Sequence, residues 1–313
     1  MNGIALVFPG QGSQRVGMGR DFWAQVPDAR RLFEQGSEVL GIDLARLCFD
    51  GPDEQLTLTT NAQPAIMAVS MAAYAALRHE GVAADYVAGH SLGEYSALVA
   101  AESLAFEDAI RVVRKRGQFM QEAVAWGAGG MAAVLGLDTG SVYAACEEAA
   151  SYGIVEVANL NSPGQVVIAG QTEAVDRAVE SAKRLGAKRA VRLQVSAPFH
   201  CSLMRPAAER LANELQTIAI ADPIVPLVNN AEAELLTRGS QIADSLVRQV
   251  TNPVRWEDVV RRLVKEGVTL FLELGPGKVL TGLIKRIAPE AAALHAEDLT
   301  SLRVAANEVA ALR

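Results

Sequence analysis

The sequence is poor in the residues that stabilise small secreted or metal-dependent proteins. Its 313 residues include three cysteines and four histidines, and the spacing of Cys48, Cys146 and Cys201 pairs none of them with another cysteine or with a histidine. A disulfide framework needs a spaced, even set of cysteines, and a structural zinc needs clustered cysteines and histidines. The pattern argues against both, and we expect a reduced protein without a metal site.

Long apolar runs and an excess of basic charge are also absent. No stretch approaches the ~20 consecutive apolar residues of a membrane span, and the N-terminus lacks the basic region that opens a signal peptide. With 29 basic and 36 acidic residues the net charge is −7, so no overall field attracts nucleic acid or an anionic membrane. We therefore expect a cytoplasmic protein that binds neither.

What the sequence does contain is an apolar fraction of 50%, enough for a sizeable core in one or two domains. A continuous apolar run, typical of a strand buried on both faces, lies at 4–8, and further strands are predicted at 86–88, 224–229 and 268–274. Helical spacing of apolar residues lies at 28–40, 61–80 and 92–102, and the Ala-rich stretch 289–313 is also predicted to be helical. Strands that alternate with helices predict a parallel α/β sheet.

The character of the sequence changes between residues 124 and 196. Strand-like segments lie at 131–135, 154–159, 165–169 and 189–195, and helical segments lie at 140–151 and 172–185. The order β-α-β-β-α-β is the ferredoxin-like arrangement, and the segment is long enough to form its own core. We expect a large α/β-hydrolase-like domain, residues 1–123 and 197–313, with an inserted ferredoxin-like subdomain, residues 124–196.

Gly89-His90-Ser91-Leu92-Gly93 matches the G-x-S-x-G pattern of a nucleophile elbow. The pattern follows a predicted strand and precedes a predicted helix, as an elbow requires. Its glycines permit a strained turn and a close approach of helix to strand, which leaves the serine hydroxyl exposed at the helix N-terminus. A merely tight turn is the alternative, since the pattern also arises by chance, but the context on both sides favours Ser91 as a nucleophile.

A serine nucleophile needs a base, and histidine is the usual one near neutral pH. His79 lies at an exposed-looking helix end, His295 lies in the Ala-rich tail, and His90 points away from its neighbour on the tight turn. His200 follows the inserted segment where the chain returns to the large domain, and junctions of that kind often line clefts. A lone histidine is more often structural, yet exclusion of the other three favours His200 as the base.

The other parts of a serine site are less clear from the residues. The carboxylates between Ser91 and His200 each lie on a helical face where solvation explains them, so a carbonyl could orient the histidine instead of an acid. The N–H of Leu92 and Gln11, on the loop after the first strand, are candidates for the two oxyanion donors. That loop lacks the third glycine and the lysine of phosphate-binding motifs, and a purely structural loop is the alternative.

Arg116 follows three other basic residues on a predicted helix. A solvated helical face is the ordinary interpretation of such a run. Arg116 is nevertheless next to Gly117 and beside the apolar Phe119 and Met120, so it is a candidate for an inward-facing position. Only a partner anion would make burial of a guanidinium tolerable.

Several short blocks, in order along the chain, resemble the malonyl-CoA:acyl carrier protein transacylases of type II fatty-acid synthesis. They are 8–14 (FPGQGSQ), 61–64 (NAQP), 88–97 (AGHSLGEYSA), 116–117 (RG), 159–165 (NLNSPGQ), 198–200 (PFH) and 275–277 (GPG). The resemblance spans nearly the whole chain. It implies a ping-pong transfer in which Ser91 takes malonyl from malonyl-CoA as an ester and passes it to the phosphopantetheine thiol of acyl carrier protein, without a cofactor.

The resemblance also implies roles for individual residues. His200 is base and then acid, and the backbone carbonyl of Gln249 orients it. Gln11 and Leu92 form the oxyanion hole, and Arg116 is a bidentate clamp for the malonyl carboxylate. The remaining substrate-binding residues that it implies are Met120, Met131, Phe199, Asn159 and Asn161. We expect the protein to act as a monomer.

Three other functions stay open from the sequence. A serine esterase or thioesterase uses the same elbow with water as acceptor, but usually has an acidic third residue. A scaffold protein would keep the fold without the chemistry, which the presence of Ser91, His200, Gln11 and Arg116 disfavours. A trans-acting acyltransferase of a polyketide pathway differs only in the carrier that it serves.

Overall fold

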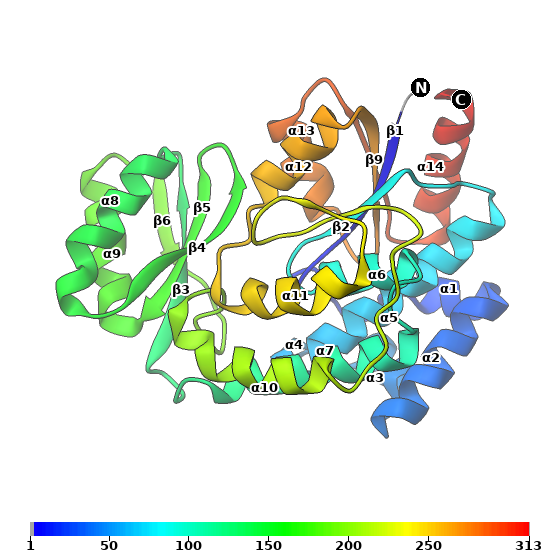
Figure 1. Cartoon of the computed structure of the whole chain (residues 1–313), viewed down its shortest axis with the longest axis horizontal. Coiled ribbons are helices and arrows are strands. Elements are labelled where there is room, and N and C mark those ends of the chain that lie inside the picture. The colour runs from blue at the N-terminus through cyan, green and yellow to red at the C-terminus, as the bar shows by residue number, and fades with distance from the viewer. Residues whose placement is uncertain (1–2, 313) are drawn as a thin grey trace.

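The computed structural model describes residues 3–312, and two β-sheets form its framework (Figure 1). The larger sheet has the strand order β10-β9-β1-β2-β7-β8. Its strands are β1 (Gly3–Phe8), β2 (Tyr86–Gly89), β7 (Leu227–Val228), β8 (Leu235–Leu236), β9 (Val268–Leu274) and β10 (Ala292–Ala296). All neighbours pair in parallel except β8, which pairs antiparallel with β7. The predicted α/β class with a parallel sheet is confirmed.

The side chains of β1 alternate between two separate apolar cores. Leu6 and Phe8 belong to the larger cluster of buried residues, whereas Ala5 and Val7 belong to a smaller one. Successive side chains of a strand point to opposite faces of the sheet, so both faces at β1 are covered. This double burial explains why the strand is an uninterrupted apolar run in the sequence.

Helices cover both faces of the larger sheet. On one face α12 (Trp256–Lys265) and α13 (Val279–Ile287) supply the smaller core, and on the other α5 (Thr59–His79) runs through the larger core with most of its residues buried. The remaining helices around this sheet are α1 (Arg20–Gln25), α2 (Pro27–Leu40), α3 (Leu44–Asp50), α4 (Asp53–Thr57), α6 (Gly93–Ala100), α7 (Phe106–Glu122), α10 (Arg205–Leu215), α11 (Ile242–Thr251) and α14 (Leu299–Leu312).

The second sheet is antiparallel and has the order β4-β5-β3-β6. Its elements are β3 (Gly129–Leu135), α8 (Thr139–Ala149), β4 (Val155–Ser162), β5 (Gln165–Gln171), α9 (Thr172–Arg184) and β6 (Arg189–Arg192), in the predicted sequence β-α-β-β-α-β. One face packs on α8 and α9 to form a third core, while Met131, Val167 and Ala169 contribute to the larger core of the main sheet. The domain boundaries at 123/124 and 196/197 stay predictions.

Two sequence-based predictions need correction. Residues 292–296, predicted as part of a C-terminal helix, form β10, and every residue of β10 pairs with β9. The open edge of β9 overrides the helical preference of alanine, and within the described part of that stretch the helix is limited to 299–312. The strand predicted at 224–229 is reduced to Leu227–Val228. Pro226 has no N–H to offer to a strand ladder, and Ile224 is 63% exposed.

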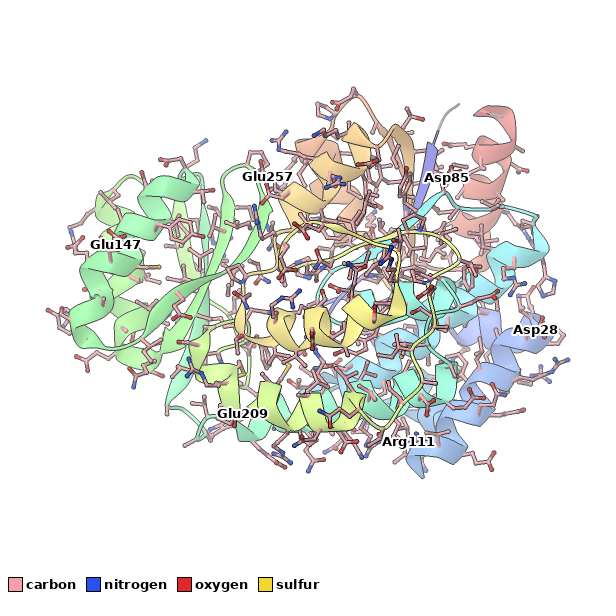
Figure 2. The ribbon with its side chains drawn as sticks, in the orientation of Figure 1. Asp28, Asp85, Arg111, Glu147, Glu209 and Glu257 are labelled. Atoms are coloured by element: carbon pink, nitrogen blue, oxygen red, sulfur yellow. The ribbon has the colours of Figure 1, made fainter. Side chains whose placement is uncertain are left out.

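Charged side chains project from the outer surfaces of several helices (Figure 2). Arg111, Glu147 and Glu209, for example, are exposed on α7, α8 and α10. Buried apolar residues of the same helices, such as Val113 on α7, pack into the cores. Within residues 3–312, no helix combines the length and the apolar character needed to cross a membrane.

Because the start of α6 packs closely on the main sheet, we expect one methyl group added at Gly93 to destabilise the protein strongly. A Cβ added to Gly93 would lie 2.0 Å from the backbone oxygen of Phe8, and neither backbone segment can move without disturbing the sheet. Gly93→Ala should therefore lower the free energy of unfolding by about 3 kcal/mol or more, measured by urea denaturation.

Gly282→Ala is the matched control for that substitution. Gly282 lies within α13, and an added Cβ there meets no atom within 4 Å. Because alanine favours a helix over glycine, this variant should be more stable by about 0.5 to 1 kcal/mol. Equal stability of the two variants would contradict the close backbone contact at Gly93.

Candidate active site

A sharp turn between β2 and α6 presents Ser91. Its backbone has φ +52°, a left-handed value that a non-glycine residue rarely adopts. A Cβ on Gly89 would lie 1.9 Å from the carbonyl carbon of Gly93, so glycine is required at both ends of the turn. This is the strand, turn and helix arrangement of a nucleophile elbow.

Asn230, just after β7, holds the elbow in place. Its Oδ1 accepts a hydrogen bond of 2.6 Å from the backbone N–H of Ser91, and its Nδ2 donates to the carbonyl of Gly89 over 2.7 Å. These bonds join the turn to the neighbouring strand. No sequence motif indicates Asn230, and the one available signal is its position at the carboxyl end of a predicted strand.

His200 lies directly against the serine. Ser91 Oγ and His200 Nε2 are 2.7 Å apart, and Nδ1 is 2.9 Å from the backbone oxygen of Gln249. A carbonyl only accepts, so Nδ1 carries the ring proton and Nε2 is free to accept the proton of the serine hydroxyl. Burial, together with the nearby charge of Arg116, lowers the pKa of His200 to about 3. The imidazole is therefore neutral at physiological pH.

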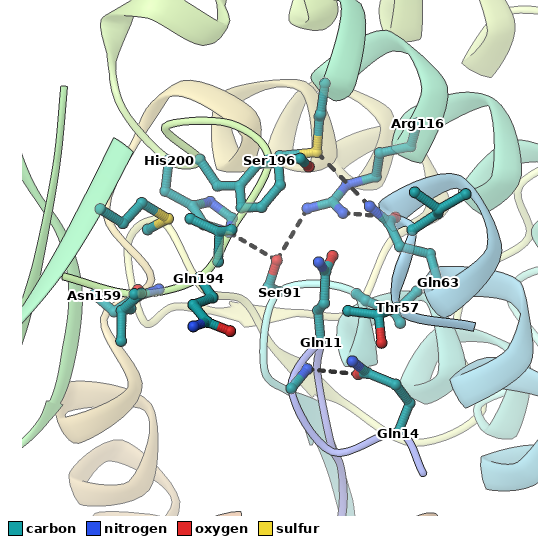
Figure 3. A pocket seen from close by; sticks show the side chains of 18 of the residues that line it. Gln11, Gln14, Thr57, Gln63, Ser91, Arg116, Asn159, Gln194, Ser196 and His200 are labelled. Atoms are coloured by element: carbon teal, nitrogen blue, oxygen red, sulfur yellow. Dashed lines mark hydrogen bonds between the residues drawn. The ribbon is translucent and has the colours of Figure 1, made fainter. Parts of the chain in front are cut away.

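Arg116 turns inward from α7 and is only 2% exposed. Its Nη1 donates to Gln63 Oε1 over 2.8 Å, and its Nη2 donates to Ser91 Oγ over 3.0 Å (Figure 3). Nη2 also donates to Gln249 Oε1 over 2.9 Å. No carboxylate within residues 3–312 forms an ion pair with it. A buried guanidinium without an anion is costly, and its position beside the serine suits an anionic ligand.

Gln11 lies on the loop after β1, and Leu92 directly follows the serine. Both residues line the same cavity. The side chain of Gln11 donates to Thr59 Oγ1 over 3.1 Å. Neither the backbone N–H of Gln11 nor that of Leu92 has a partner among the described residues. Both groups are thus free to donate to a ligand.

A cavity of about 730 Å³ opens over these groups. The predicted residues Met120, Met131, Phe199 and Asn159 are among those that line it. Met131 and Asn159 come from the antiparallel sheet and Met120 from α7, so the cavity lies where the two parts of the fold meet. Trp126, which is 82% exposed, lies at its edge.

Two predicted residues lie outside the cavity lining. Gln249 lies behind the serine and is fully buried. Asn161, predicted to bind substrate, has its Oδ1 2.9 Å from His90 Nε2. The structure thus places Asn161 as a partner of the histidine next to the nucleophile rather than on the cavity wall.

The remaining histidines and the cysteines lie apart from this chemistry. His79 is exposed and pairs with Asp28, and His295 lies on β10. The three cysteines are buried and unpaired, and burial raises the pKa of Cys201, next to His200, to about 12. Among residues 3–312, no three His, Cys, Asp or Glu side chains are grouped so that they could hold a metal ion.

Comparisons with known proteins point to one family. The profile of the acyl transferase domain family matches residues 5–306. The chain is 47% identical to the malonyl CoA-acyl carrier protein transacylase of Bacillus subtilis, with 97% of this chain and 96% of that protein covered. It is 52% identical to the enzyme of the same name from Escherichia coli strain K12, with 92% and 93% covered.

Solved structures agree with these sequence matches. An acyl carrier protein S-malonyltransferase from Vibrio cholerae superposes with a TM-score of 0.94 at 46% identity, covering 96% of this chain and 99% of that one. A complex between a type II polyketide synthase acyl carrier protein and its malonyl transacylase contains a chain that superposes with a TM-score of 0.96 at 47% identity, covering 98% and 100%.

The low pKa of His200 predicts an unusual pH profile for the reactivity of Ser91. Between about pH 8 and pH 5 the imidazole stays neutral, because its pKa is about 3, so it can accept the serine proton throughout. The rate at which a fluorophosphonate labels Ser91, read by intact mass, should therefore be constant over that range. His200→Ala should be slower by roughly 10²- to 10⁴-fold. A decline centred near pH 6.5, the ordinary pKa of histidine, would contradict the assignment.

Proposed function

The chain belongs to the acyl transferase family, and we propose that it transfers malonyl from coenzyme A to the phosphopantetheine thiol of an acyl carrier protein in fatty-acid synthesis. The resemblance inferred from the sequence blocks is confirmed by the profile match and by the relatives named malonyl CoA-acyl carrier protein transacylase. The observation that carries the substrate assignment is the buried, unpaired guanidinium of Arg116, 3.0 Å from the nucleophile.

The first half-reaction forms an ester on Ser91. As Ser91 Oγ attacks the thioester carbonyl carbon of malonyl-CoA, its proton passes to His200 Nε2, 2.7 Å away. The negative charge on the carbonyl oxygen is stabilised by the free N–H groups of Gln11 and Leu92. The carbon–sulfur bond then breaks, and the departing thiolate of coenzyme A takes the proton from His200.

The second half-reaction runs the same steps with another thiol. His200, neutral again, takes the proton of the phosphopantetheine thiol, and the sulfur attacks the ester carbonyl of malonyl-Ser91. The carbon–oxygen bond breaks, and Ser91 Oγ recovers its proton from the imidazolium. The Ser91–His200 dyad serves both half-reactions, because His200 returns to the same neutral state after each one.

Arg116 supplies the preference for malonyl. Malonyl differs from acetyl by a terminal carboxylate, and a guanidinium binds a carboxylate through two parallel hydrogen bonds. Acetyl would leave the buried charge unpaired, which a polar site penalises strongly. The side chains of Met120, Met131 and Phe199 are among the apolar groups that line the cavity, where they limit the access of water to the ester.

The reaction as proposed needs no cofactor and no metal ion, because the dyad, the backbone donors and Arg116 perform every step. All of these groups come from one chain, so we propose that a monomer is competent. A cytoplasmic location suits the three buried, unpaired cysteines.

Intact mass measurement tests the ester directly. Incubation with malonyl-CoA, without carrier, should add one malonyl group, which peptide mapping should place on Ser91. Holo acyl carrier protein should remove it quickly, whereas water should remove it slowly. Rapid release of coenzyme A without an adduct would instead indicate a thioesterase, and no reaction with either malonyl- or acetyl-CoA would support a scaffold.

Arg116→Ala tests the carboxylate clamp. Loss of a buried charge partner should lower kcat/KM for malonyl-CoA by roughly 10²- to 10³-fold, equivalent to about 3 to 4 kcal/mol. Acetyl loading should survive or increase, since acetyl has no carboxylate. Arg111→Ala, an exposed arginine on the same helix, is the matched control and should change neither rate. An equal loss of malonyl and acetyl loading would show that Arg116 does not bind the malonyl carboxylate.

A further inference from the structure

The side chain of Gln249 connects the groups of the active site. Its Nε2 donates to the backbone oxygen of Ser91 and to Glu94 Oε2, each over 2.9 Å. Its Oε1 accepts from Arg116 Nη2 over 2.9 Å, while its backbone oxygen accepts from His200. The amide therefore lies between Arg116 on one side and Glu94 on the other.

Glu94 is a carboxyl buried away from solvent. It lies in the first turn of α6 and is 0% exposed. Its Oε2 accepts from Gln249 Nε2 and, over 3.0 Å, from the backbone N–H of Asn230. Its Oε1 is buried without a partner. Oε2 is saturated with donors, so a proton on Glu94 has its place on Oε1.

The charges of Glu94 and Arg116 are linked. The acidic residues that are buried within residues 3–312 are Glu94 and Glu273, and only Glu94 shares a hydrogen-bonding side chain with Arg116. An ionised Glu94 offsets the buried guanidinium, and the guanidinium in turn favours ionisation of Glu94. A second anion bound to Arg116 would offset the positive charge that favours ionisation of Glu94, so the pKa of Glu94 would rise.

The other groups that face Glu94 do not replace Arg116 in this role. The Glu232 carboxylate opposes ionisation of Glu94, but it is paired with Arg248. Burial raises the pKa of Tyr95, so that its hydroxyl stays neutral, and His200 is neutral as well. Burial raises the pKa of Glu94 itself to about 7, against the opposing effects of its hydrogen bonds and of Arg116.

We propose that Glu94 is a positioning residue that balances the charge of Arg116 through the Gln249 amide and takes up a proton when the carboxylate of the acyl group binds Arg116. The proton comes from solvent, binds Oε1 and is released when the acyl group leaves on the carrier. This inference rests on the proposed function, since it needs a carboxylate-bearing acyl group at Arg116.

Proton uptake fixes the direction of the pH dependence. A ligand that raises the pKa of a group binds more weakly as the pH rises above the pKa of the free protein. The affinity for malonyl-CoA should therefore fall above about pH 7, by at most about tenfold per pH unit. Acetyl-CoA, which brings no second anion, should show no such dependence.

Calorimetry with Ser91→Ala measures the proton directly. This variant binds malonyl-CoA without forming the ester, and the difference in binding heat between phosphate and Tris buffers at about pH 7.5 gives the number of protons taken up. We expect uptake of a fraction of one proton with malonyl-CoA and none with acetyl-CoA. The same protein serves in both arms, so the comparison does not depend on whether a Glu94 variant folds.

Two further variants assign the proton to its residue. Glu94→Gln, added to Ser91→Ala, keeps an acceptor for Gln249 and should abolish the uptake. Glu273→Gln is the matched control, because burial raises the pKa of Glu273 to about 7 as well, while its partners Leu280 and Thr281 lie outside the cavity lining. It should leave the uptake unchanged.

The outcomes separate this inference from the proposed function. If wild-type protein forms the malonyl ester but Ser91→Ala takes up no proton with malonyl-CoA, or if Glu94→Gln leaves the uptake intact, Glu94 does not have this role. If wild-type protein forms no malonyl ester and Ser91→Ala does not bind malonyl-CoA, the proposed function itself is wrong.

Discussion

The guanidinium of Arg116 is buried where no carboxylate pairs with it, and the arrangement of the site follows from that charge. Neutral oxygens of Gln63, Gln249 and Ser91 accept its hydrogen bonds, and the cavity leaves room for an anion beside it. Burial, together with the same charge, lowers the pKa of His200, which keeps the imidazole neutral and able to accept a proton. Arg116 therefore acts on the state of the base as well as on the anion that the cavity is proposed to bind.

A second constraint is steric and positions the serine relative to that charge. Glycines at both ends of the turn let α6 approach the ends of β1 and β2, and the left-handed backbone of Ser91 follows from this close approach. Asn230 then joins the turn to β7. Strain in the turn is tolerated because the surrounding backbone is held by the parallel strands of the main sheet.

Several parts of the site could be predicted from the sequence because their signals are local. The G-x-S-x-G block is enough to indicate Ser91 as the nucleophile. The chain has four histidines, and His200 is the one that follows the inserted segment, which favours it as the base. The apolar neighbours of Arg116 make it only a candidate for an inward-facing position. The resemblance to the family is what implies that it binds the malonyl carboxylate. The catalytic and binding roles of Ser91, His200 and Arg116 stay predictions, as do those of Gln11, Leu92 and Gln249. The structure places Gln11 and Leu92 in the same cavity as Ser91, and Gln249 within hydrogen-bond distance of Ser91 and His200.

The sequence by itself determined the strand, turn and helix around the nucleophile, the β-α-β-β-α-β segment and the residue types available for catalysis. Only the tertiary structure decided that residues 292–296 form a strand, because pairing with β9 outweighs local helical preference. It also decided that Asn230, Gln249 and Glu94 form one hydrogen-bonded network with Ser91. Asn230 and Gln249 lie far from Ser91 and Glu94 in the chain, and hydrogen bonds between the two pairs depend on packing that no local pattern records.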